Sequence, residues 1–269
     1  MNGSRFRSAL MLASATLLAS CGGGSGDGRT AAPAFSLAGT WYSDAHDAVG
    51  AAFTAQSIIR ESGSQILITH CDRSTETVAR SGNELRNLDG TPYYLAIQDA
   101  TTLVSRSGTG SGAHIWKHSD SLRFESGSAS FTFPSGDTLA SDSDVCAKVE
   151  NGRFFNLAGR EIAAPIVTIT APYRDSWVRI AIAFREIADG RYDIVGYEPF
   201  FADRAGLATV QDLSSPLFAA QYGAEDMIFK SGTVQVSNYT GSAVELAGSV
   251  VLGGGTLRFT ARVSLAPRG

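Results

Sequence analysis

Short runs in which apolar and polar residues alternate dominate the chain from Phe35 onwards. In the run 65–72, alternate positions place Ile66, Ile68 and His70 on one face. Period two, with Gly, Ser or Asp between the runs, is typical of strands joined by turns. Similar runs occur at 56–61, 75–80, 93–98, 101–106, 114–118, 121–125, 128–133 and 145–149. Their spacing predicts an all-β chain built from antiparallel barrel or sandwich units.

The second half alternates more strictly. Val178, Ile180 and Ile182 are separated by Arg179 and Ala181. A helix is the alternative, since Ala and Arg favour helices. Strict period two and the turn at 189–190 favour a β-hairpin from 178–184 to 191–197 instead. The segment 226–265 predicts a meander of three or four strands with turns at 238–241 and 253–255.

One segment, 199–223, carries helical signals. Ser215 precedes Pro216, and Gly223 follows Tyr222. This arrangement predicts a short capped helix over 217–222. We expect the segment to close one end of a sheet, and a lid over a ligand is the alternative.

The N-terminus has the pattern of an export signal. Arg5 and Arg7 precede an apolar run at 9–19, which is too short for a permanent transmembrane helix. Leu18-Ala19-Ser20-Cys21 resembles the lipobox of bacterial lipoproteins, and the resemblance implies that Cys21 becomes the lipidated first residue. The alternative is an ordinary signal peptide with a cysteine nearby. Gly22, where an aspartate would imply inner-membrane retention, implies an outer-membrane lipoprotein of the bacterial cell envelope on either the periplasmic or the surface face.

Four regions follow from these patterns. We expect a lipoprotein signal peptide at 1–20, a lipidated Gly/Ser-rich tether at 21–34, a first β unit at 35–150 and a second antiparallel β unit at 151–269. The pentapeptide at 35–39, FSLAG, recurs as FNLAG at 155–159 and weakly supports two units.

Charge gives no sign of a nucleic-acid partner. Removal of the expected signal peptide would also remove Arg5 and Arg7. The mature chain would then have 20 basic and 26 acidic residues. A mildly acidic chain without a basic stripe does not track phosphates. The membrane contact expected is through acyl chains on Cys21, since lipid burial is worth about 0.8 kcal/mol per CH₂.

Two cysteines remain after Cys21 is assigned to the lipid. In an exported chain, Cys71 and Cys146 most simply form one disulfide. This bond would place the strand at 145–149 in the first unit, with a boundary near Asn151 and Gly152. Two free buried thiols are the alternative.

A six-residue motif opens the first unit. Leu37-Ala38-Gly39-Thr40-Trp41-Tyr42 resembles the first strand of lipocalins and lipocalin-like bacterial domains. The resemblance implies that Gly39 and Trp41 close one end of a barrel whose cup binds apolar molecules. The Thr-Asp-Tyr segment of many lipocalins is missing, and no arginine that covers the tryptophan is identifiable. A tryptophan anchoring a generic β core is the alternative, and barrels of this size can also be filled.

The sequence shows no catalytic, metal or cofactor motif. No serine lies in Gly-x-Ser-x-Gly, and no zinc or phosphate-loop signature occurs. His46 lies between Asp44 and Asp47 in a polar turn, and His114 and His118 are about 13 Å apart along one strand. The acidic pair Asp142 and Asp144 lies in a polar connection, where we expect it to be solvated. We therefore expect neither an enzyme nor a metal or cofactor, although a triad of distant residues is compatible with the sequence.

Three functions compete. The first is a non-catalytic, lipid-anchored envelope protein that binds a small apolar molecule or a protein. The second is a surface-exposed interaction lipoprotein, because the tether followed by β units resembles two-lobed relatives of transferrin-binding proteins. The third is a hydrolase, which would need a site where a nucleophile meets a base.

Overall fold

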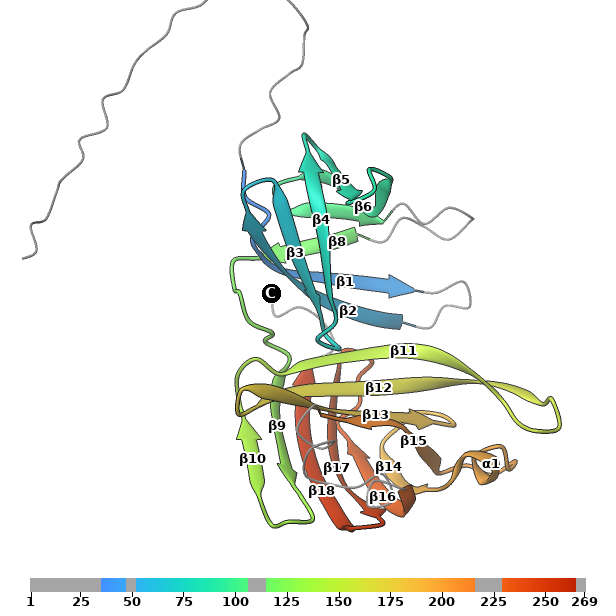
Figure 1. The fold of residues 1–269 in the computed structure, drawn as a ribbon. Helices are drawn as coiled ribbons and strands as arrows, with labels where there is room; N and C mark the ends of the chain where they lie inside the picture. Colours follow the sequence, from blue (N-terminus) through green and yellow to red (C-terminus); the bar gives the residue numbers. More distant parts are fainter. Residues whose placement is uncertain (1–34, 47–51, 106–114, 216–228, 265–269) are drawn as a thin grey trace, which may run out of the picture. The chain divides into compact units, whose positions relative to one another are not determined.

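The computed structural model describes residues 35–46, 52–105, 115–215 and 229–264 (Figure 1). About two thirds of these residues lie in strands, as the alternating pattern predicts, and one short helix, α1 (Tyr197–Phe200), is present among them. Within this part of the chain, no helix has the length and apolar character needed to cross a membrane. The expected signal peptide, the expected tether and Cys21 lie outside the described residues.

Eight antiparallel strands form a closed barrel, here called the first barrel. They are β1 (Gly39–His46), β2 (Ala52–Ser62), β3 (Gln65–His70), β4 (Thr75–Ser81), β5 (Glu84–Asn87), β6 (Pro92–Asp99), β7 (Thr102–Ser105) and β8 (Ile115–Ser119). Each strand pairs with the next along the chain, and β8 pairs with β1 through Trp41 and His118. Closure removes the free sheet edges that would otherwise template aggregation.

Apolar side chains at alternate positions fill the interior of the first barrel. They form one cluster: Leu37, Trp41, Ile59, Ile66, Ile68, Val78, Leu85, Tyr93, Leu95, Ile97, Leu103 and Trp116. Because side chains two residues apart on a strand share a face, this list also identifies which other positions face inward.

Three turns of the first barrel use the same local device. Asp72, Asp89 and Asp99 each accept hydrogen bonds from the backbone and hydroxyl groups of the Ser or Thr two residues later. Such bonds fix the turn without tertiary contacts. They also lower the pKa of Asp89, through the hydroxyl and backbone of Thr91.

The remaining strands form the second sheet, which curls around its own core. They are β9 (Gly127–Thr132), β10 (Thr138–Ser141), β11 (Cys146–Phe155), β12 (Glu161–Tyr173), β13 (Ser176–Phe184), β14 (Gly190–Ile194), β15 (Leu207–Ser214), β16 (Phe229–Ser237), β17 (Ala243–Leu252) and β18 (Gly255–Ser264). Their order is β10-β9-β18-β17-β16-β14-β15-β13-β12-β11. A bridge between Glu125 and Val145 brings the start of β11 to the start of β9, so the sheet returns on itself.

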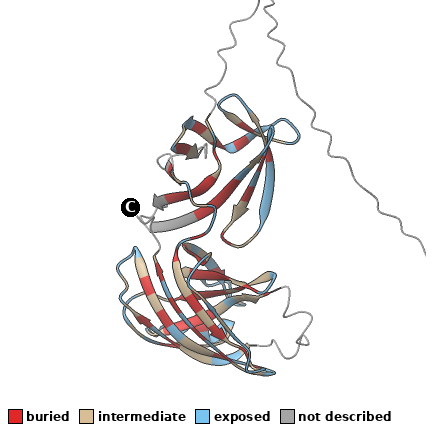
Figure 2. Cartoon of the chain, turned by 90° about the vertical axis from the view of Figure 1, so that its left-hand side faces the viewer, coloured by how far each residue is buried: buried red, intermediate tan, exposed pale blue. Residues whose placement is uncertain are grey.

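Burial alternates along the strands of the second sheet. On β18, Leu257, Phe259 and Val263 are buried in the core, whereas Arg258 and Thr260 are exposed. Figure 2 shows the same change from buried to exposed along these strands. The expected meander at 226–265 is present as β16, β17 and β18, with turns where the glycines predict them.

Three expected elements differ in the structure. The run 121–125 is not a strand and contributes only the bridge from Glu125 to Val145. The hairpin from 178–184 to 191–197 does not form, because β15 lies between β13 and β14 and pairs with both. In the interval 199–223, residues 207–214 are strand β15, and the helix lies earlier, at Tyr197–Phe200. The helix expected at 217–222 falls outside the described residues.

The predicted disulfide joins Cys71 and Cys146, whose Cα atoms are 5.4 Å apart. It lies against Ile58 and Phe124, and links the end of β3 to the start of β11. Strand pairing nevertheless assigns β9, β10 and β11 to the second sheet. The boundary expected near Asn151 and Gly152 therefore falls inside β11, and the change of sheet lies between β8 and β9.

Candidate functional site

The Gly39-Thr40-Trp41 motif opens β1 and lies at one end of the first barrel. Trp41 is fully buried, and its indole N–H donates a 2.8 Å hydrogen bond to the Leu37 carbonyl. Its ring lies 4.8 Å from that of His118 on β8, centroid to centroid. The indole therefore joins the two strands that close the barrel.

Gly39 is required by its backbone and by its neighbour. Its φ of +152° lies outside the range that L side chains normally adopt, and a Cβ here would collide with the imidazole of His118 and the Ser119 carbonyl. His118 Nε2 is 3.0 Å from the Ala38 carbonyl oxygen. The glycine lets the chain pass against this histidine.

The ion pair of Arg80 and Glu61, 3.4 Å from Nη1 to Oε1, holds the segment 35–38 across the same end. Glu61 accepts hydrogen bonds from Ser36 Oγ at 2.6 Å and from the Leu37 N–H at 3.0 Å. Arg80 donates to the Phe35 carbonyl at 2.7 Å and lies over the Phe35 ring. Arg80 thus covers Phe35, and His118 packs on Trp41. Together these contacts close this end of the barrel and serve a structural role.

The interior face of the first barrel also carries polar residues, here called the mouth cluster: Ser57, His70, Glu76 and Tyr93. Ser57 is the cross-strand partner of Trp41. Each is two residues from a buried interior side chain on its own strand, so each faces inward. Ser57 and His70 are also cross-strand partners. Sequence alternation places His70 on the inward face of its strand. It does not predict that the other three residues meet His70, because four different strands supply the cluster.

The mouth cluster forms a continuous chain of contacts. Ser57 Oγ is 3.0 Å from His70 Nδ1, and His70 Nε2 is 3.3 Å from Glu76 Oε1 without hydrogen-bond geometry. The Tyr93 hydroxyl donates to Glu76 Oε2 at 2.5 Å. Serine, imidazole and carboxylate are thus connected in that order.

The environment of Tyr93 keeps its phenol protonated. Burial raises the pKa of Tyr93 far above its usual value, and the adjacent Glu76 carboxylate adds to the effect. Burial also raises the pKa of Tyr94, whose ring lies 4.4 Å from that of Tyr93. A protonated Tyr93 fixes the Glu76 carboxylate as an acceptor.

The serine, histidine and acid of the mouth cluster resemble a catalytic triad with reversed ring nitrogens. In the well-known serine protease arrangement, Nε2 faces the serine and Nδ1 faces the acid. Here Nδ1 faces Ser57, and only 3% of the Ser57 surface is exposed. The arrangement can pass the hydroxyl proton to the imidazole, but it presents little of the nucleophile.

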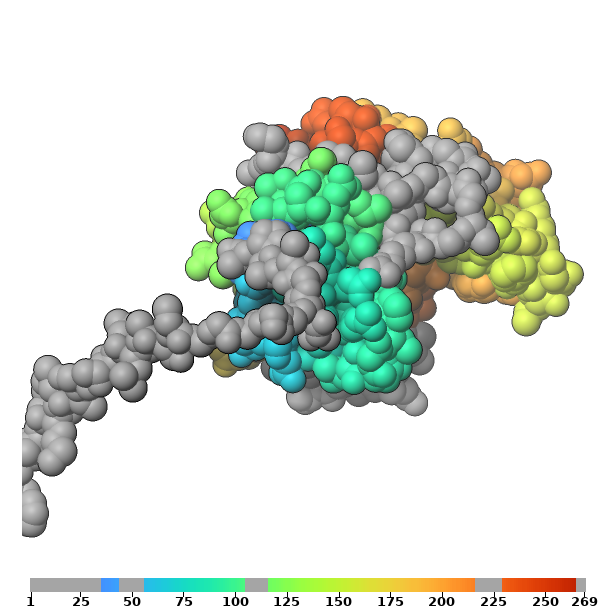
Figure 3. Space-filling view, turned by 90° about the horizontal axis from the view of Figure 1, so that it is seen from above, coloured from blue at the N-terminus to red at the C-terminus, as the bar shows by residue number. Residues whose placement is uncertain are grey.

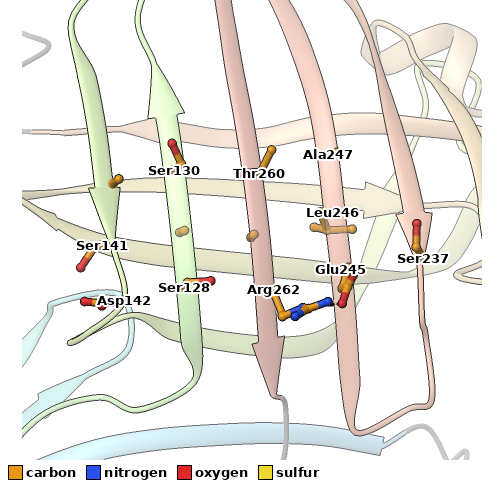
Figure 4. Close-up of a pocket in the computed structure, with 13 residues that line it drawn as sticks. Ser128, Ser130, Ser141, Asp142, Ser237, Glu245, Leu246, Ala247, Thr260 and Arg262 are labelled. Carbon is orange, nitrogen blue, oxygen red and sulfur yellow. Dashed lines mark hydrogen bonds and ion pairs between the residues drawn. The ribbon is translucent and has the colours of Figure 1, made fainter.

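The second sheet has an open hollow of about 600 Å³ on β9, β10, β16, β17 and β18, here called the outer groove (Figure 4). Small outward side chains such as Ser128, Ser130 and Thr260 leave the space. Arg262 reaches across to Glu245 on the neighbouring strand at 2.5 Å.

Other predicted residues divide between described and undescribed regions. The side chains of Asp44 and His46 fall outside the described residues, as do Asp47 and His114. No group of metal-ligating side chains occurs in the part of the chain that is described. Asp142 borders the outer groove, whereas Asp144 is not solvated as expected: it accepts from Arg73 and from the Phe124 N–H, both at 3.1 Å.

Comparisons of the chain with family models, curated proteins and solved structures found no match.

Proposed function

We propose that the chain is a lipid-anchored, non-catalytic binding protein of the bacterial outer membrane that recognises a protein partner through its outer surface. The anchor is Cys21 of the lipobox-like sequence. The observation that carries the proposal is the packing of large apolar side chains into the cores of both β structures, among the residues that the structure describes.

The packing of the interior favours a protein over a small apolar molecule as the partner. A cup for an apolar molecule needs an enclosed space of a few hundred Å³. In the first barrel, the central inward positions hold large buried residues such as Trp41, Leu103 and Trp116. A protein partner needs only an outer surface, and the second sheet offers exposed strands with a groove.

Native mass spectrometry of the full chain, purified in detergent from its own envelope, tests this proposal. We expect the acyl mass on Cys21 together with a co-purifying protein. A small molecule bound instead would restore the lipocalin-like function, and an unlipidated chain without any partner would contradict the proposal. Protease treatment of intact cells then distinguishes a surface protein, which is released, from one facing the periplasm.

A second candidate function, a serine hydrolase, is favoured by the mouth cluster alone. Ser57 Oγ would attack an ester-like centre while His70 takes the hydroxyl proton and Glu76 stabilises the imidazolium. A fluorophosphonate probe tests this directly, because phosphorus bonds to Oγ and fluoride leaves. Labelling that is lost in Ser57→Ala and His70→Ala, but kept in Ser74→Ala, would establish the hydrolase. If the native chain is not labelled, the hydrolase proposal fails.

A further inference from the structure

The hairpin between β11 and β12 ends in an unusual group of exposed apolar side chains. Leu157 is 95% exposed, Phe155 is 55% exposed, and Tyr197 of the adjacent α1 is 45% exposed. We call these three residues the apolar tip. Figure 3 shows the yellow-green atoms of this hairpin projecting at the edge of the molecule, beside the orange atoms of the α1 segment. Contiguous exposed apolar groups mark interaction sites more often than scattered ones do.

Hydrogen bonds fix the backbone of the tip. The Tyr197 hydroxyl accepts from the Phe155 N–H at 3.2 Å and donates to the Phe155 carbonyl at 3.0 Å. The Leu157 N–H donates to Glu198 Oε1 at 3.1 Å. Asn156 and Arg160 close the turn through backbone and side-chain bonds. The backbone that carries the exposed leucine is therefore held in place and loses little freedom on contact.

A buried aromatic cluster supports the tip from beneath. The Phe154 ring lies 5.6 Å from Phe200 and 6.5 Å from Tyr197, and Tyr197 lies 5.3 Å from Phe201. Phe154, Phe200 and Phe201 are all buried. The core needs these three residues, but it makes no use of Leu157.

The repeated pentapeptide makes the contrast clear. In FSLAG, Leu37 is fully buried in the first barrel, whereas in FNLAG the corresponding Leu157 faces solvent. An apolar residue that packing does not require is free to serve binding. Aromatic and aliphatic anchors that enter a pocket typically supply most of the energy of an interface.

Charges of both signs surround the tip. Arg153 pairs with Glu161 at 3.2 Å, and Arg160 lies 3.7 Å from Asp203. Arg185 also pairs with Asp203, at 3.8 Å, so with Glu198 at the base of Leu157 the acidic and basic groups are equal in number. A rim with both signs in balance gives no electrostatic attraction to an anionic bilayer, and a bilayer gains nothing from a rigid tip because lipids adapt to any shape.

We propose that the apolar tip is the anchor by which the chain docks into an apolar pocket of a protein partner, with charges of both signs around that pocket. The inference rests on the proposed function and assigns it a surface. A convex tip with a polar rim matches a concave apolar site, and a preorganised anchor avoids part of the entropy cost of binding.

Photo-crosslinking in intact cells tests the surface. The full lipidated chain carries Leu157→p-benzoylphenylalanine, with Leu88→p-benzoylphenylalanine as a matched control, since Leu88 is also an exposed leucine in a turn. A third variant places the same group at Thr260 in the outer groove. We expect one discrete protein adduct from position 157, with the crosslinked peptide in an apolar pocket, and none from position 88.

Binding of the identified partner to the purified chain completes the test. Leu157→Ser should weaken binding at least tenfold without moving the urea midpoint, while Leu88→Ser should change binding less than twofold. The proposed role of the apolar tip would be wrong if position 157 gave lipid adducts, if position 88 gave as much protein adduct as position 157, or if Leu157→Ser left the affinity unchanged. Protein adducts at Thr260 alone would overturn the tip but keep the proposed function, and no protein adduct at any position would contradict both.

Discussion

Trp41 acts as a structural residue through its contacts with Leu37 and His118. Trp41→Ala should lower the free energy of unfolding by about 3–5 kcal/mol, because a large buried aromatic ring leaves a cavity. Urea midpoints measured with the disulfide intact check this, with Leu157→Ala as an exposed control expected to change by less than about 0.5 kcal/mol. A loss below about 1 kcal/mol at Trp41 would end the barrel-closure role.

Tyr93 should make the stability of the first barrel sensitive to alkali. Burial raises the pKa of Tyr93 in the native state, whereas the unfolded phenol ionises near pH 10. The native chain then binds more protons than the unfolded chain above pH 10. Stability should therefore fall as the pH rises through this range, by up to about 1.4 kcal/mol per pH unit for this group.

Tyr93→Phe should remove this part of the pH dependence. Urea midpoints at pH 8, 9.5 and 11 measure it, and the difference between the native chain and the variant cancels the other tyrosines. Equal slopes for the two proteins would show that Tyr93 ionises freely in the folded state.

The residues of the candidate sites differ in how far the sequence could predict them. Alternation places His70 on the same face as Ile66 and Ile68, and Gly39 with Trp41 forms a recognisable motif. Ser57 and Glu76 carry no local signal, because their contacts depend on the register of three strands. Leu157 looks like a repeat of Leu37, and only its environment separates the two.

Strands with strict alternation were predictable, whereas short or polar strands such as β5 and β10, and also the long strand β12, were not. β5 contains one buried apolar residue, Leu85, and β10 has none, so neither shows period two. The order of β13, β14 and β15 also lies beyond the sequence pattern. A turn at Asp189 and Gly190 is compatible with a hairpin of β13 and β14. The position of β15 between these two strands depends on contacts that are distant in sequence.

The disulfide fixes two elements that belong to different sheets. Cys71 and Cys146 are separated by 75 residues, so the bond should stabilise the fold by about 4–5 kcal/mol through the restricted unfolded chain. The double variant Cys71→Ser/Cys146→Ser should lose about this amount in urea unfolding. Non-reducing peptide mapping provides the control, and two free thiols in the native chain would contradict the bond.

At the scale of the whole molecule, the sequence predicts an all-β chain and the bond between Cys71 and Cys146, but it assigns both cysteines to one unit, whereas they lie in different β structures. The reason is β11, whose first residue, Cys146, bonds to the first barrel while its backbone pairs with β12. A disulfide indicates proximity and does not indicate which sheet a strand joins. Pairing along the full length of β11 and β12 outweighs the single bridge from β11 to β2.

The proposed lipid anchor at Cys21 is the property of the whole chain that is easiest to test. Cys21→Ser should abolish lipidation, because serine offers no thiol for the acyl-glyceryl group, and the chain should leave the membrane fraction as an unprocessed or soluble form. Acyl chains supply the membrane affinity in our proposal, and the acidic mature chain adds no electrostatic attraction to anionic lipid. Membrane fractionation with intact-mass analysis measures both effects, and Ser20→Ala is a control that retains the thiol. If Cys21→Ser fractionated with the membrane as the native chain does, a second anchor would be required and the lipobox reading would fail.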